Sequence, residues 1–138
     1  MTTQQIGVKA IIQQDNKILL MKRSSKYEHL EDAWDVPGGR INFGEEPLEG
    51  LKREIQEETG LELNQVNKIL DTSTVFKDNT KHIVRITYFC SVKQGTAKIS
   101  NEHTNLTWIP ITQLNQLNFK DFLLKKTIKN IIQISNYK

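Results

Sequence analysis

The chain contains a short segment in which carboxylate side chains recur at helical spacing. Glu54, Glu57 and Glu58 are three and four positions apart, so they fall on one face of a helix. Like charges at this spacing repel each other and destabilise the helix that carries them. Such a cluster is tolerated if the face is fully solvated or if a cation neutralises it. The segment is therefore either a solvated acidic face or a metal site.

The residues around this cluster predict where its helix begins and ends. Pro47 suits the first helical turn, where its missing N–H would have no partner in any case. Gly60 suits the position just past the end, where the backbone turns left-handed. Leu48, Leu51 and Ile55 recur between them at helical spacing and form an apolar stripe. A helix over residues 47–59 is predicted.

The glutamates belong to a longer ordered set of residues. Its fixed members are Gly39, Glu45, Arg53-Glu54-Ile55, Glu57-Glu58 and Gly60-Leu61. This set resembles the signature of the Nudix hydrolase family, the MutT-like phosphohydrolases. That signature is Gly, five residues, Glu, seven residues, Arg-Glu-apolar, one residue, Glu-Glu, one residue and Gly-apolar. Every fixed position is filled, over 23 of the 138 residues.

The resemblance implies roles for these side chains. Arg53 would hold the glutamates in place by charge-assisted hydrogen bonds, and Glu45 would support the edge of the metal site. A backbone carbonyl near Gly39 would touch the metal. The metal is expected to be Mg²⁺, which prefers oxygen ligands, and Mn²⁺ fits the same set. The carboxylate ligands that the resemblance implies are Glu54, Glu57 and Glu58. Glu54 and Glu57 are also expected to be catalytic, together with Arg53.

One further acid is expected from outside the signature, as a general base or an extra ligand. Glu102 is the candidate, because it precedes Trp108 by six residues in a loop that follows a long strand. This placement resembles the layout that is common in the family. The alternative is a solvated loop glutamate, since loops are rich in exposed charge.

Two arginines are candidates for binding the substrate phosphates. Arg23 lies at a predicted strand end, and Arg40 lies in the loop that leads into the predicted helix. Solvated surface arginines are the equal alternative. Trp34 and Trp108 could stack on a base, and packing in the core is at least as plausible for each.

Strands and helices alternate along the rest of the chain. Apolar residues on both faces of residues 83–93 predict a central strand. The last helix is predicted to bury Phe122, Leu123, Ile128, Ile131 and Ile132. Strands that bracket two helices favour a mixed sheet between helices, and the resemblance implies this α/β (α+β) arrangement, an α/β/α sandwich. The predicted strands are Ile6–Gln13, Lys17–Arg23, 66–76, 83–93 and 106–110, with a turn at 77–80 and a last helix over 119–134.

Length and composition bound the class of protein. The 138 residues predict a single domain, 1–138, and 25% charged with 37% hydrophobic residues is ordinary for a soluble chain. The net charge of +3 is not gathered into a stripe with aromatics, so no stable nucleic-acid partner is expected. The single cysteine, Cys90, is expected in the core. No leader and no long apolar run is present, which favours a cytoplasmic protein without membrane contact, either monomer or homodimer.

The expected activity is hydrolysis of a nucleoside diphosphate linked to another group. Nucleoside triphosphate pyrophosphohydrolase activity is preferred. ADP-ribose-type relatives tend to carry a proline about fifteen residues past the signature, where this chain has Val75 and Phe76. Dinucleoside-polyphosphate relatives tend to carry a tyrosine slightly later, where this chain has Lys77-Asp78-Asn79. An ADP-sugar or dinucleoside-polyphosphate pyrophosphatase, a non-catalytic nucleotide-binding module and a protein that docks partners on its acidic helix are the alternatives.

Overall fold

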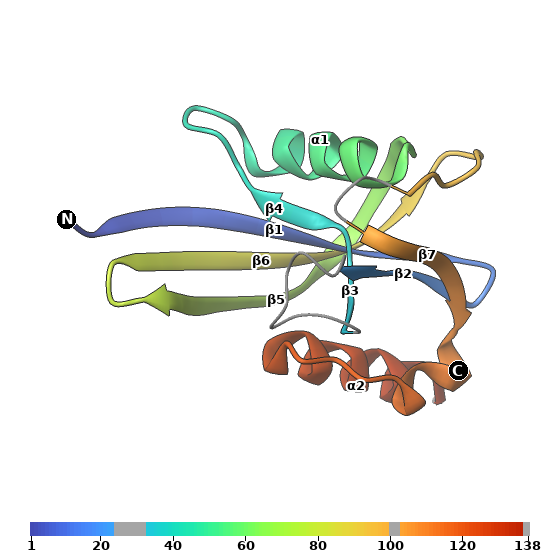
Figure 1. The fold of residues 1–138 in the computed structure, drawn as a ribbon. Coiled ribbons are helices and arrows are strands. Elements are labelled where there is room, and N and C mark those ends of the chain that lie inside the picture. Colours follow the sequence, from blue (N-terminus) through green and yellow to red (C-terminus); the bar gives the residue numbers. More distant parts are fainter. Residues whose placement is uncertain (24–32, 100–102, 137–138) are drawn as a thin grey trace.

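A mixed β-sheet with one helix on each face forms the body of the protein (Figure 1). The computed structural model describes residues 1–23, 33–99 and 103–136. Besides a short 3₁₀ helix at Ile111–Gln116, its elements are β1 (Thr3–Gln14), β2 (Lys17–Arg23), β3 (Trp34–Asp35), β4 (Gly38–Arg40), α1 (Pro47–Thr59), β5 (Leu63–Asp78), β6 (Lys81–Val92), β7 (His103–Pro110) and α2 (Phe122–Asn136).

The sheet has seven strands, with the order β3-β2-β1-β6-β5. In addition, β4 pairs with β1 and β7 pairs with β2. β1 and β6 run parallel at the centre, and the other pairings are antiparallel. The predicted α/β/α sandwich with a mixed sheet is confirmed. α1 has the predicted bounds, with Pro47 in its first turn and Gly60 in the left-handed conformation at its end.

Alternate residues of the central strands supply the two halves of the core. On one face Ile11 and Leu20 pack with Leu124 and Ile128 of α2. On the other face a second cluster includes Leu51 and Ile55 of α1 together with Ala10, Ile12, Tyr88 and Cys90. β6 is therefore the central strand that its sequence predicts, and Cys90 is buried in the core as expected.

Several predicted details differ from the structure. α2 begins at Phe122 rather than at residue 119, and Phe122 is 76% exposed instead of buried. The cause is Asp121, whose carboxylate accepts a hydrogen bond from the Leu124 N–H (3.0 Å) and caps the helix three residues late. In α1 the buried row runs through Leu51, Ile55 and Thr59, whereas Leu48 is 47% exposed.

The cap of α2 is also the anchor that joins this helix to the sheet. The Asp121 carboxylate accepts two hydrogen bonds from the buried guanidinium of Arg85 on β6. Burial on its own would raise the pKa of Asp121. The hydrogen bonds from Arg85 and from the Leu124 N–H outweigh it, and the pKa lies below its ordinary value.

Asp121→Asn is expected to lower the free energy of unfolding by about 2 kcal/mol at pH 7, because it leaves the Arg85 charge buried without its partner. A depressed folded-state pKa gives stability that is present above the unfolded value and is lost as pH falls through the folded one. The difference between variant and wild type should therefore shrink as pH falls below about 4. Urea unfolding at pH 7 and at pH 3 measures it. The control is Asp71→Asn, which removes a carboxylate that forms no ion pair in the described chain. Equal stability of Asp121→Asn and wild type at pH 7 would contradict the account.

Candidate active site

β4 is hydrogen-bonded to β1 along one edge, and its other edge faces α1. In an antiparallel pair, the backbone groups of alternate residues face the partner strand and those of the residues between face away. Two hydrogen bonds show which residues of this segment face β1: the Ala10 N–H donates to the Pro37 carbonyl (2.8 Å), and the Ile41 N–H donates to the Ile6 carbonyl (2.9 Å). The N–H and C=O of Gly39 therefore face β1, whereas those of Gly38 and Arg40 face α1.

Side chains of α1 use these outward-facing backbone groups. The Gly38 N–H donates to Glu58 Oε1 (3.1 Å), and Arg53 Nη2 donates to the carbonyl of Arg40 (3.2 Å). Gly39 lies directly against the Glu54 carboxylate, because a Cβ at this position would be 2.6 Å from its Cδ. Glycine at position 39 therefore allows the acidic face of α1 to approach β4 closely.

Arg53 is the centre of the cluster. Its Nε and Nη2 donate to the two oxygens of Glu45 (2.9 and 3.0 Å), and its Nη1 donates to Glu54 (2.9 Å) and more weakly to Glu57 (3.3 Å). Hydrogen bonds from Arg53 and from the Asn42 N–H lower the pKa of Glu45. The structure thus brings Glu45, from the loop before α1, together with the predicted helical residues.

Glu58 lies on the inner side of this cluster. Burial raises the pKa of its carboxyl to about 8, and contact with Glu54 also raises it. The hydrogen bond from the Gly38 N–H lowers the pKa but does not outweigh these effects. Two carboxyl groups in contact need a proton or a cation between them. Glu58 is half-buried and lies against Glu54, so this part of α1 is not a fully solvated acidic face.

The donors fit a hard divalent cation, although they are not gathered around one point. Within residues 1–23, 33–99 and 103–136, no three His, Cys, Asp or Glu side chains form a ready metal site. Glu54 and Glu57 are turned onto Arg53, and Glu58 is turned onto Gly38. The donors at hand are carboxylate oxygens, the ligands that Mg²⁺ and Mn²⁺ prefer. By register the carbonyl of Gly38, not that of Gly39, faces this side, and the ligand set stays a prediction.

Gly39→Ala is expected to lower turnover by about 10²-fold, because the added Cβ displaces the Glu54 carboxylate and small misplacements in a reacting site cost this much. Steady-state kinetics on the purified variant measures it. Gly95→Ala is the matched control, because a Cβ there meets its nearest neighbour at an ordinary 3.5 Å. Turnover of Gly39→Ala equal to that of Gly95→Ala would show that the contact has no role.

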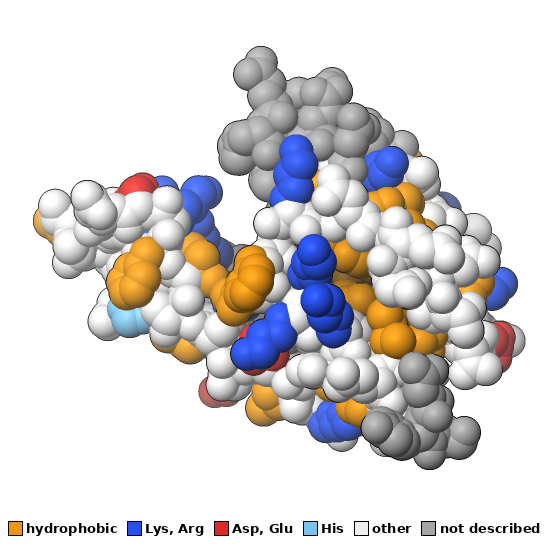
Figure 2. Space-filling view, turned by 90° about the horizontal axis from the view of Figure 1, so that it is seen from below, with side chains coloured by type: hydrophobic (Ala, Val, Ile, Leu, Met, Phe, Trp, Pro, Cys, Tyr) orange, Lys and Arg blue, Asp and Glu red, His pale blue; other side chains and the backbone are white. Residues whose placement is uncertain are grey.

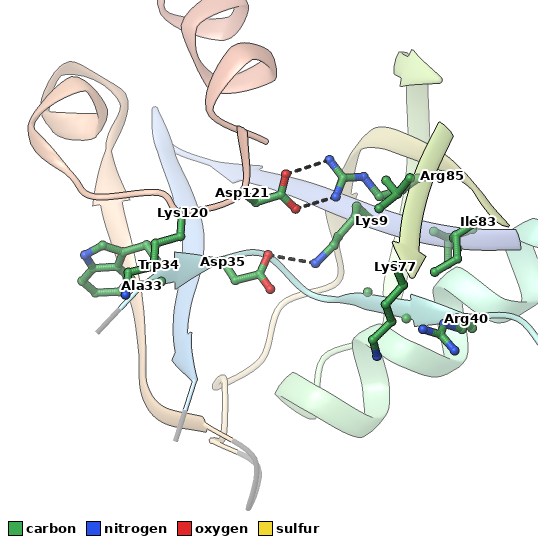
Figure 3. Close-up of a pocket in the computed structure, with 15 residues that line it drawn as sticks. Lys9, Ala33, Trp34, Asp35, Arg40, Lys77, Ile83, Arg85, Lys120 and Asp121 are labelled. Carbon is green, nitrogen blue, oxygen red and sulfur yellow. Dashed lines mark hydrogen bonds and ion pairs between the residues drawn. The ribbon is translucent and has the colours of Figure 1, made fainter. Parts of the chain in front are cut away.

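A cavity of about 420 Å³ opens beside β4 (Figure 3). Lys9 and Asp35 form an ion pair on its wall (2.8 Å), and Arg85 and Asp121 form another. The predicted residues Arg40 and Trp34 both line it. Trp108 is not among its lining residues and packs against the core beneath α1.

Sequence reasoning missed most of the charged residues of this cavity. Lys9, Lys77 and Lys120 were not singled out, nor were Asp35, Arg85 and Asp121. One signal for a buried charged residue was present in the sequence, because Arg85 lies on a strand with apolar residues on both faces. Two predicted residues cannot be placed: Glu102 lies outside the described residues, and only the backbone of Arg23, in β2, is described. Both remain predictions.

Comparison with known proteins decides the family. The sequence matches the family described as NUDIX domain over residues 3–131. The chain belongs to the Nudix family. An ADP-ribose pyrophosphatase from Methanocaldococcus jannaschii is 32% identical over 132 residues, which are 95% of this chain and 75% of that protein. A MutT-like protein from Streptomyces ambofaciens is 26% identical over 106 residues, which are 77% of this chain and 63% of that protein.

The Nudix assignment agrees with the fold. The crystal structure of the MutT protein from Methanosarcina mazei superposes with a TM-score of 0.80 at 25% identity, covering 99% of this chain and 98% of that one. No helix in the described part of this Nudix chain is long and apolar enough to cross a membrane.

Proposed function

We propose that this Nudix protein is an enzyme that hydrolyses a nucleoside diphosphate linked to another group, with a divalent metal. The observation that carries the proposal is Arg53, which holds Glu45, Glu54 and Glu57 together at the edge of β4. A cavity with cationic side chains opens beside the same strand. Carboxylates for a metal thus lie next to a pocket suited to an anionic ligand.

Members of the Nudix family generally use divalent metal ions, and here Mg²⁺ is the proposed metal. When bound, it would neutralise the diphosphate and activate a water. Glu54, Glu57 and Glu58 are the proposed ligands, with the carbonyl of Gly38. Arg53 orients the glutamates, Arg40 binds phosphate, and Glu102 is the proposed base.

Within this class, a nucleoside triphosphate is the preferred substrate, cleaved to the monophosphate and pyrophosphate. Both Arg40 and Lys77 line the cavity, and a triphosphate offers them more negative charge than a diphosphate joined to a sugar. An ADP-sugar is the second candidate. It is favoured by the similarity to the ADP-ribose pyrophosphatase over nearly the whole chain.

A substrate panel with Mg²⁺ tests the proposal. Nucleoside triphosphates, ADP-ribose and dinucleoside polyphosphates are each incubated with the protein, and pyrophosphate, inorganic phosphate and nucleoside monophosphate are quantified. Release of pyrophosphate and monophosphate from a triphosphate supports the preferred activity, and preference for ADP-ribose supports the second. Binding without turnover of any member would instead indicate a nucleotide-binding module.

A further inference from the structure

The hairpin of β5 and β6 extends past both helices as an arm, and the N-terminal end of β1 lies beside it (Figure 1). The strand β5 continues to Asp78, so the connection is tighter than the predicted turn over 77–80. Val75 and Lys77 near the end of β5, and Ile83 on β6, line the cavity. The arm therefore forms one wall of the proposed substrate pocket.

Lys77 occupies an irregular position in this arm. Phe76 pairs with His82 and Asp78 pairs with Lys81, which leaves Lys77 without a residue opposite. Such a bulge re-aims a side chain and is common beside active sites. In the close-up, the side chain of Lys77 runs from β5 toward β4 and Arg40 (Figure 3). Both side chains border the same cavity.

The charges in the cavity are unevenly compensated. Its two carboxylates are already engaged, Asp35 by Lys9 and Asp121 by Arg85. In the described chain, the side chains of Arg40 and Lys77 form no ion pair or hydrogen bond. Figure 2 shows Lys and Arg side chains gathered at the hollow where the arm joins the body. Two uncompensated cations at one pocket favour a ligand with a concentrated negative charge.

Arg40 also connects this pocket to the acidic cluster. Its carbonyl accepts a hydrogen bond from Arg53, and its side chain lines the cavity. We propose that Lys77 and Arg40 form a phosphate clamp, in which Lys77 on the arm binds a phosphate of the substrate and holds it against β4. The clamp rests on the proposed function for its role in turnover. It makes the arm a determinant of preference for triphosphates over diphosphates that are joined to an uncharged group such as a sugar.

Kinetics and binding of Lys77→Met and Lys77→Arg test the clamp. Methionine keeps most of the stem and removes the charge, and arginine restores a donor. Lys68→Met is the matched control, because Lys68 is exposed on the same strand but borders a different groove. The substrates are a nucleoside triphosphate and ADP-ribose, and the binding probe is inorganic pyrophosphate with Mg²⁺, titrated calorimetrically.

For Lys77→Met we expect KM for the triphosphate to rise about tenfold, the loss typical of one charge-assisted hydrogen bond, with kcat within about twofold. KM for ADP-ribose should rise less, and pyrophosphate binding should weaken by about the same tenfold. Lys77→Arg should recover most of the loss, and Lys68→Met should behave as wild type.

The outcomes separate this inference from the proposed function. If wild type hydrolyses no nucleotide but its pyrophosphate binding depends on Lys77, the proposed function fails and the clamp stands. If wild type is active and Lys77→Met keeps its KM and pyrophosphate affinity, the clamp is wrong. Absence of pyrophosphate binding by wild type, or an equal loss in Lys68→Met, also overturns it.

Discussion

Replacement of Arg53 by alanine is expected to lower turnover by about 10²-fold or more, because the glutamates lose the group that fixes their positions. Arg53 donates to Glu45 through two nitrogens and to Glu54 through a third. Without it, three carboxylates repel one another, so the melting midpoint of the metal-free protein should also fall. Steady-state kinetics with Mg²⁺ and thermal unfolding in a chelator measure the two effects.

Arg53→Lys separates geometry from charge. A lysine ammonium is a point charge, whereas the guanidinium donates in a planar fork to several acceptors at once. The lysine variant should therefore recover part of the melting midpoint and little of the turnover. Full rescue of turnover by lysine would show that only net charge matters at this position.

Glu57→Gln is expected to remove most activity, at least about 10²-fold, while the fold stays intact, because it deletes the charge of a proposed metal ligand. The side chain of Glu57 is largely exposed, and its ion pair with Arg53 is the longest of the three. Loss of this carboxylate also relieves repulsion within the acidic face. The melting midpoint without metal should therefore stay the same or rise.

The measurement compares kcat at saturating Mg²⁺ for wild type, Glu57→Gln and Gln56→Ala. Gln56 is the exposed neighbour on α1, and its side chain forms no hydrogen bond with the cluster in the described chain. Its replacement should leave kcat within about twofold of wild type, as surface substitutions usually do. Near-wild-type turnover of Glu57→Gln would contradict the metal site.

The helix α1 could be predicted from the sequence because its signals are local. Pro47 and Gly60 mark its ends, and the i, i+3 and i+4 spacing of the glutamates is a property of the helix alone. The pairing of Arg53 with Glu45 is different. Glu45 lies in the loop before the helix, and only the family resemblance indicated that it belongs to the site.

The cavity could not be predicted because its residues come from strands that are distant in the sequence. Lys9 on β1 meets Asp35 on β3, and Arg85 on β6 meets the residue before α2. These ion pairs depend on the order of the strands in the sheet, which the hydrophobic periodicity of the sequence does not determine. Phe122 shows the same limit on a smaller scale, since the cap at Asp121 shifted the helix start and turned this apolar residue outward.

Binding of Mn²⁺, followed by the electron paramagnetic resonance signal of the free ion, tests most directly whether the acidic face of α1 is a metal site. Wild type, Glu57→Gln and Gln56→Ala are titrated under the same conditions. The account predicts that wild type and Gln56→Ala bind Mn²⁺ equally, and that Glu57→Gln binds at least about tenfold more weakly, a loss of roughly 1.4 kcal/mol. Equal affinity of Glu57→Gln and wild type, or no binding by wild type, would contradict it.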